Sequence, residues 1–202
     1  MKFLVIPMLD RLSAFISGQT IGVASLSCTI ECYSCKPAGE DKKLGKALHR
    51  QYSKELEQDP TSPILTATPI GNLHDTHTQR LLINLISTLN ATFPDYDFST
   101  SKPEEFYRVA IATAVQTVNK ALAEVLQADG KPLLDQLWGA IDSAVTLRDC
   151  DVYAYIPDLD CDPFSSSSLC VGWCQPTHNP DPPQLVVQLL LPQQVCQEDF
   201  VL

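Results

Sequence analysis

Three aspartates at every second position, Asp158, Asp160 and Asp162, are the side chains of this sequence best suited to chemistry. Carboxylates released after a strand can bind a cation or position a phosphoryl group. A calcium loop that begins at Asp158 needs glycine at its sixth position for the sharp turn and glutamate at its twelfth to bind the ion with two oxygens. Those positions hold Pro163 and Leu169, so this kind of site is excluded.

Two interpretations of these aspartates remain. An aspartate that assists phosphoryl transfer needs lysine and hydroxyl side chains to balance the phosphate charge, and no lysine lies between Asp149 and Phe164. More distant residues could still supply one. Short acidic side chains in a turn also accept hydrogen bonds from their own backbone. The composition of the segment favours a solvated turn at the end of a strand.

The eight cysteines offer a second possibility, a zinc site. Cys32 and Cys35, with Cys170 and Cys174, have paired spacings that resemble a four-thiolate site. The run around Cys32 alternates like a strand, which directs Cys32 and Cys35 to opposite faces and disfavours a shared ion. We therefore expect no metal and no cofactor. The apolar N-terminal run is interrupted by charge too early for a signal peptide, so we expect a reducing, intracellular compartment in which the thiols are free.

Length and charge limit the classes of function. The chain has 202 residues, which suits one domain with a sizeable core. Its formal net charge is −10, from 24 acidic and 14 basic side chains. Such a surface repels phosphates, which disfavours direct binding to nucleic acid and favours basic protein surfaces as partners. No apolar stretch reaches the length that crosses a membrane, so we expect no membrane association.

Apolar periodicity predicts the elements that position the aspartates. Alternation places Val152, Ala154 and Ile156 on one face of a strand and Tyr153 and Tyr155 on the other. Apolar stripes predict helices at 9–16, 79–91, 101–130 and 132–147, and runs of strand character lie at 23–36 and 184–191.

Two stretches without a period divide the chain. Residues 1–48 and 79–164 are predicted to be two parts of one globular domain. Residues 49–78 contain three prolines and no apolar stripe in their second half, so we predict a mobile insert there. Residues 165–202, which begin with four serines and crowd their apolar run with prolines, are predicted to form a divergent, poorly ordered tail.

Three blocks of sequence resemble the Maf-type repressor of RNA polymerase III transcription, a eukaryotic family unrelated to the leucine-zipper proteins of similar name. The first, IECYSCKPAGEDKK at 30–43, is similar to the family's ESYSCK and its GDK-type turn. The second, LISTLNATFPDYDFST at 85–100, is similar to its TLN helix end and PDYDFS. The third, at 137–164, is similar to its LWxx[IV]D helix and CD[IV]YxYxPDxDxDPF. The blocks occur in the family's order.

The resemblance implies an α/β (α+β) fold, in which helices pack on a mostly antiparallel sheet in a single domain with a disordered, phosphorylated insert. It implies that the protein is not an enzyme. The family binds RNA polymerase III near its clamp and hinders the meeting of the polymerase with the TFIIB-related initiation factor. Regulatory kinases keep it inactive, and it is found in the nucleus and the cytoplasm.

The family's most distinctive surface motifs fall on two acidic segments of this chain. We assign these segments to partner binding or local scaffolding: Asp95, Tyr96, Asp97 and Phe98, and Asp158, Asp160 and Asp162. In the purely structural alternative, Tyr96 and Phe98 fill the core and Asp97 caps a helix.

Within the predicted insert, Ser62 and Thr68 each precede a proline and are the candidate phosphoacceptors. A phosphate adds a charge of about −2, which would weaken docking on a basic partner.

The chain departs from the family after Phe164. The family continues with a final strand pair and a basic segment for nuclear import, whereas this chain reads SSSSLCVGWCQPTHNP from Ser165 onward. Loss of a core strand would expose a sheet edge and an apolar face. A truncated isoform that cannot bind the polymerase is therefore an alternative interpretation.

A second resemblance covers ten residues. TATPIGNLHD at 66–75 is similar to the TPIGNLxD signature of ribosomal RNA methyltransferases that use S-adenosylmethionine. That signature normally follows an N-terminal strand in a longer, two-domain chain, and no glycine-rich loop supports it here. We treat a methyltransferase as the weaker alternative.

Overall fold

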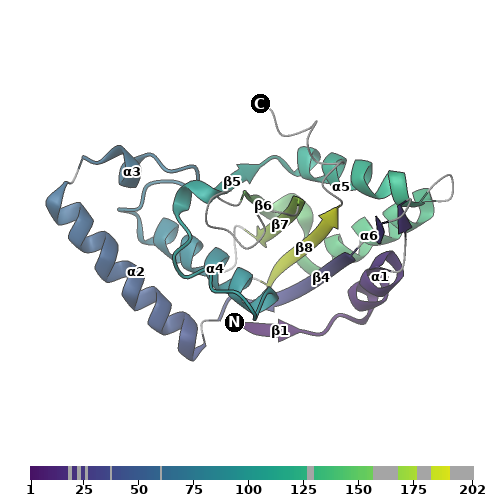
Figure 1. Cartoon of the computed structure of the whole chain (residues 1–202), viewed down its shortest axis with the longest axis horizontal. Coiled ribbons are helices and arrows are strands. Elements are labelled where there is room, and N and C mark those ends of the chain that lie inside the picture. The colour runs from purple at the N-terminus through teal and green to yellow at the C-terminus, as the bar shows by residue number, and fades with distance from the viewer. Residues whose placement is uncertain are drawn as a thin grey trace.

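An antiparallel sheet of six strands lies at the centre of the computed structural model, which describes residues 1–17, 20–21, 24–25, 27–36, 38–59, 61–126, 130–156, 168–176 and 183–191 (Figure 1). The strand order is β1-β4-β8-β7-β6-β5. These strands are β1 (Lys2–Leu4), β4 (Ser27–Ser34), β5 (Phe106–Val109), β6 (Cys150–Tyr155), β7 (Ser168–Pro176) and β8 (Pro183–Leu191). A separate hairpin pairs β2 (Thr20–Ile21) with β3 (Ala24–Ser25).

Helices cover both faces of the sheet (Figure 1). They are α1 (Pro7–Ser17), α2 (Gly39–Gln58), α3 (Pro63–Thr66), α4 (Thr76–Thr92), α5 (Ile111–Leu126) and α6 (Gly130–Val145). Helices α1, α5 and α6 share a core with one face, while α4 packs on the other face and α2 lies against α4. Among the described residues, no helix combines the length and the hydropathy that a membrane crossing requires.

Alternation along the strands separates two cores. In β6, Cys150 and Val152 join the core beneath α1, α5 and α6, whereas Tyr153 and Tyr155 join the core beneath α4. The predicted alternation is therefore confirmed for these side chains, and Ile156, just past the strand, is 44% exposed. The predicted class, a mostly antiparallel sheet packed by helices, is also confirmed.

The helices predicted at 9–16, 79–91 and 132–147 correspond to α1, α4 and α6. The helix predicted at 101–130 is wrong in its first part. Pro103–Glu105 form a single 3₁₀ turn, and Phe106–Val109 form β5 before α5 begins. Phe106 is fully buried, and its ring centroid lies 5.3 Å from that of Tyr155 on the paired strand. Burial of this aromatic against the sheet outweighs the local helix-start signal.

Residues 49–78, the predicted insert, carry defined elements in the structure. The segment up to Gln58 continues α2, and α3 follows. Leu65, Ile70 and Leu73 are 3%, 8% and 0% exposed and belong to the core beneath α4. Apolar anchors scattered among prolines have no period, so the pattern did not reveal them. The mobility of this segment and the domain boundaries stay predictions.

The expected loss of a strand pair after Phe164 is corrected by the structure. Strands β7 and β8 pair with each other and lie between β6 and β4, at the centre of the sheet. Pro176 is the last residue of β7 and Pro183 the first of β8, so these prolines stand at strand ends, where a missing N–H is tolerated. The apolar run at 184–191 supplies the strand that its composition suggested. The order of the tail as a whole stays a prediction.

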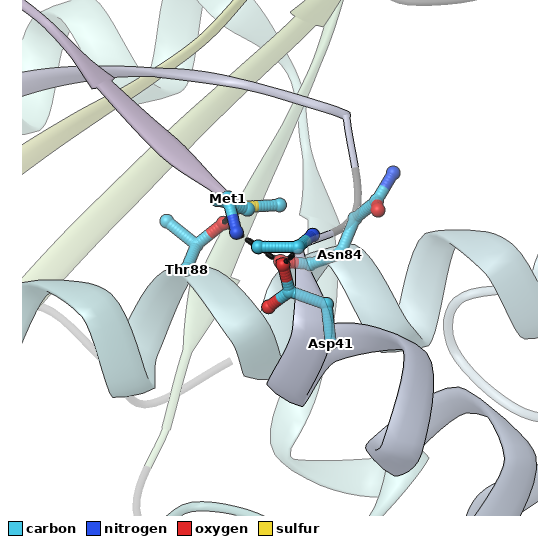
Figure 2. Close-up of polar contacts among 5 residues, drawn as sticks. Met1, Asp41, Asn84 and Thr88 are labelled. Carbon is cyan, nitrogen blue, oxygen red and sulfur yellow. Dashed lines mark hydrogen bonds and ion pairs between the residues drawn. The ribbon is translucent and has the colours of Figure 1, made fainter.

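A polar joint ties the sheet edge to two helices (Figure 2). The Met1 ammonium forms an ion pair with Asp41 in the first turn of α2, and the Ala38 N–H donates to the same carboxylate at 2.6 Å. On the other side of Met1, the Thr88 hydroxyl of α4 lies 3.1 Å from the Met1 sulfur and donates to the Asn84 carbonyl at 2.7 Å. Strand β1, α2 and α4 therefore meet at this joint.

We expect Asp41→Asn to lower the free energy of unfolding by about 1.5–3 kcal/mol at neutral pH, the range for a hydrogen bond to a charged group. Burial opposes ionisation of Asp41, but bonds from the Met1 ammonium and the Ala38 N–H lower its pKa below the usual value. Because the pKa of Asp41 is lower in the folded state than in the unfolded state, the ionised carboxylate stabilises the fold above about pH 4. This stabilisation is lost as the pH falls through the folded-state pKa. The difference from wild type should therefore shrink in acid.

Urea denaturation from pH 7 down to pH 3 measures this difference. Glu40→Gln is the matched control, because Glu40 is the neighbouring acid and its side chain is 86% exposed. Equal stability of the Asp41 and Glu40 variants at pH 7 would contradict the role of the joint.

Candidate functional site

A short loop after α4 holds the first acidic segment in one conformation. The Phe93 N–H donates to the Leu89 carbonyl at 2.8 Å and closes the helix, and the Tyr96 N–H donates back to the Phe93 carbonyl at 3.1 Å. The Asn90 side chain then accepts from the Phe98 N–H at 2.7 Å. Hydrogen bonds between residues close in sequence therefore define the shape of the loop.

Phe98 anchors this loop to the sheet. It is 3% exposed, and its ring packs edge-on against Tyr155 of β6 with 5.9 Å between centroids. Phe93 lies at the same distance on another side, and Tyr96 lies at 6.5 Å. Aromatic contacts of this kind contribute about 0.5–1.5 kcal/mol beyond area burial. The contact brings together two blocks of sequence that the chain separates, the PDYDF loop and the strand that precedes the three aspartates.

The remaining residues of the loop face solvent. Tyr96 is 44% exposed, and Asp95 and Asp97 are exposed. The side chain and backbone N–H of Ser99 hydrogen-bond to Asp97 and hold the pKa of Asp97 below its usual value, so this carboxylate is charged at neutral pH. The structural alternative is thus correct for Phe98 alone: Phe98 fills the core, Tyr96 does not, and Asp97 accepts within a turn rather than at a helix.

The second predicted acidic segment, Asp158, Asp160 and Asp162, lies outside the described residues. The two described residues just before this segment contact neighbouring elements. Tyr155 contacts Phe98, and the N–H of Ile156 donates to the Glu105 carbonyl at 2.8 Å.

Sequence reasoning missed an acidic group near Tyr52 and the start of β5. Glu104 and Glu105 precede β5, and Glu55 lies on α2. Burial chiefly, and the negative charges of these three carboxylates in addition, raise the pKa of Tyr52 to about 12. That effect requires all three to lie near the Tyr52 phenol. No pattern in the sequence joins Glu55 to the other two, because a helix and a turn some fifty residues apart meet only in the fold.

Four cysteine side chains are buried thiols. Each is at most 6% exposed: Cys28, Cys32, Cys35 and Cys150. Burial raises the pKa of Cys28 to about 12 and that of Cys32 to about 11, so these thiols stay protonated at neutral pH. Metals bind the thiolate form. Within the described ranges, no three histidine, cysteine or acidic side chains are grouped so as to hold a metal ion.

The two candidate phosphoacceptors lie in different settings. Ser62 is half-buried, and its carbonyl accepts from the N–H groups of Leu65 and Thr66 at the start of α3. The hydroxyl of Thr68 donates to the Gly71 carbonyl at 2.5 Å inside a turn, which the Gly71 N–H closes onto the Thr68 carbonyl at 3.0 Å.

The same turn explains the TPIGNL run without methyltransferase chemistry. Gly71 has φ of +124°, and a Cβ there would lie 2.9 Å from the Thr78 hydroxyl, so only glycine fits. Ile70 and Leu73 on either side are buried in the core. Proline, isoleucine, glycine and leucine are therefore used for a turn and its anchors.

Comparisons with known proteins define a class for this architecture. The family model described as Maf1 regulator matches residues 26–174, which leaves β1, α1 and β8 outside the match. A crystal structure of citrus MAF1 shares the fold, with a TM-score of 0.65 and 24% identity over 91% of this chain and 97% of that chain. A second crystal form of citrus MAF1 has a TM-score of 0.64 and is 26% identical over 90% of this chain and 97% of that chain.

Two relatives agree with this class. The repressor of RNA polymerase III transcription maf1 of Schizosaccharomyces pombe is 31% identical over 180 residues, 85% of this chain and 74% of that protein. The repressor of RNA polymerase III transcription of Dictyostelium discoideum is 27% identical over 84% of this chain and 76% of its own length. The chain therefore belongs to the Maf1 family, whose members are regulatory repressors and not enzymes. The resemblance drawn from the three blocks is confirmed.

We expect Phe98→Ala and Tyr96→Ala to separate the two kinds of residue in the loop. Phe98→Ala empties a buried ring site and should lower the free energy of unfolding by about 3–5 kcal/mol. Tyr96→Ala should cost less than about 1 kcal/mol, because Tyr96 is 44% exposed and does not fill the core. Thermal and urea denaturation of both variants measure this, and equal losses of stability would contradict the assignment of Phe98 as the anchor.

Proposed function

We propose that this chain represses RNA polymerase III transcription by binding the polymerase and blocking engagement of the TFIIB-related initiation factor. The main support is the family match over residues 26–174 together with relatives named as repressors of this polymerase. The packing of Phe98 on Tyr155 adds to it, since the two motifs that carried the resemblance lie side by side.

The surface that we assign to polymerase binding consists of Asp95, Tyr96 and Asp97, held by Phe98. An exposed aromatic ring flanked by carboxylates suits a basic protein surface, because the ring supplies contact area and can lie against an arginine while the acids supply long-range attraction. We keep Asp158, Asp160 and Asp162 as candidate partner-binding residues, because they follow Tyr155 in the chain and Tyr155 contacts Phe98. The net charge of −10 favours the same kind of partner.

We expect the double substitution Asp95→Asn with Asp97→Asn to weaken binding to purified RNA polymerase III by about three- to tenfold, since exposed ion pairs contribute about 0.2–1 kcal/mol each. Asparagine keeps an acceptor for the Ser99 N–H, so the loop should keep its shape. Raising salt should narrow the difference from wild type.

Asp135→Asn is the matched control, because Asp135 is an exposed acid on α6, across the sheet from the loop. A titration with labelled protein gives both affinities. Failure of the wild-type chain to bind the polymerase would contradict the proposed function and would favour the truncated isoform. Equal affinity of the double variant and the control would contradict the assignment of the loop.

We further propose that regulatory kinases control this activity and that the protein divides between nucleus and cytoplasm. Ser62 and Thr68 are both half-buried, and in this proposal the hydrogen bond of the Thr68 hydroxyl separates them. We call Thr68 the gated acceptor, because its hydroxyl donates a hydrogen bond to the Gly71 carbonyl inside the turn that carries the buried Ile70. A phosphate on Thr68 removes that donor and requires the turn to open.

A proline-directed kinase should therefore label Ser62 faster than Thr68 in the native protein, and the rates should converge in urea. Thr68→Glu should destabilise the fold by about 1–3 kcal/mol, the cost of a lost hydrogen bond and its unpaired acceptor, while Ser62→Glu should change stability little. Peptide mass spectrometry gives the rates. Faster native labelling of Thr68 would contradict the gate.

A further inference from the structure

Strand β5 lies at one end of the six-stranded sheet that the described residues form, with one edge open there. Among the described strands it pairs only with β6. The N–H of Ile156 donates to the Glu105 carbonyl, which marks these two residues as a hydrogen-bonded pair of the ladder. Such pairs alternate along antiparallel strands, so Tyr107 and Val109 direct their backbone groups toward β6 and Arg108 directs its N–H and carbonyl outward. An open edge of this kind is a template for another strand.

The face of the sheet beside the open edge carries two exposed apolar side chains, Tyr107 on β5 and Ile156 just after β6. Tyr107 is 42% exposed and Ile156 is 44% exposed. Tyr107 lies opposite Ala154, which places it diagonal to Ile156 on the same face of the sheet. An added strand presents alternate side chains to that face, where they lie beside Tyr107, with Ile156 one strand further in.

Negative charge surrounds the same edge. Glu104 and Glu105 immediately precede β5, and Glu55 lies near them because all three act on the Tyr52 phenol. Among the residues next to β5 in the sequence, the cations are Lys102 and Arg108, and Arg108 is already paired with Asp151 across β5 and β6. The uncompensated charge at this edge is therefore acidic.

We propose that the β5 edge binds an extended, basic segment of a partner protein, which adds to the sheet as a further strand. The backbone of the segment bonds to the outward N–H and carbonyl of Arg108. Its apolar side chains contact Tyr107, and its lysines or arginines meet Glu104 and Glu105. Where the partner is the polymerase, the inference rests on the proposed function and names the chemistry of the segment that docks.

The first test compares Arg108→Pro with Arg108→Ala in a titration with RNA polymerase III. Both variants lose the ion pair with Asp151, but only proline removes the outward N–H. Arg108→Pro should bind at least about tenfold more weakly than Arg108→Ala, a change in binding that reflects a lost backbone bond and a blocked edge. Equal affinities of the two variants, with wild type binding, would overturn the docking edge and leave the proposed function intact.

The second test does not use the polymerase and needs no substitution. Isotope-labelled wild-type protein is titrated with a peptide of about eight alternating lysine and valine residues, a typical strand length, and with a matched glutamate–valine peptide. The lysine peptide should shift the Tyr107 and Arg108 amide resonances and slow hydrogen exchange at Arg108. Equal shifts with both peptides, or shifts away from β5, would overturn the inference even if the polymerase does not bind the chain.

Discussion

Both faces of the central sheet must be buried, and the rest of the structure depends on this requirement. Strand β4 sends Ile30 toward α1 and Tyr33 toward the other core, and β6 divides its side chains in the same way. In the sheet that the described residues form, β7 and β8 lie between these two strands and supply backbone partners for each. The divergent C-terminal segment therefore completes the sheet. Without this segment, the sheet surface on which each core packs would be interrupted.

The candidate binding surface is a loop anchored to this sheet, in which one residue is buried and its neighbours are exposed. Phe98 packs against Tyr155 and anchors the loop. The neighbouring Tyr96 and the carboxylates of Asp95 and Asp97 are thereby held where they are exposed. A surface that is shaped before binding loses less conformational entropy on docking. Such an arrangement suits a protein that acts by occupying a site on another macromolecule, where position and charge matter and no bond is made or broken.

Elements with their own periodic signal were predictable from the sequence, and elements defined by distant partners were not. The alternation of Val152, Tyr153 and Tyr155 led directly to β6, and the stripes of α1, α4 and α6 to their helices. Strand β5 was predicted as helix because its identity comes from Tyr155, some fifty residues away. The acidic loop was located through family resemblance, but its split into a buried Phe98 and an exposed Tyr96 depends on three-dimensional packing.

An order-of-addition transcription assay tests most directly whether the protein acts by excluding the initiation factor. Purified RNA polymerase III, the TFIIB-related factor and a polymerase III template are combined, and the chain is added either before or after the polymerase meets the factor. Strong loss of transcript on early addition, and much less on late addition, is the predicted result. Equal transcript levels with and without the protein, in either order, would contradict repression by occlusion.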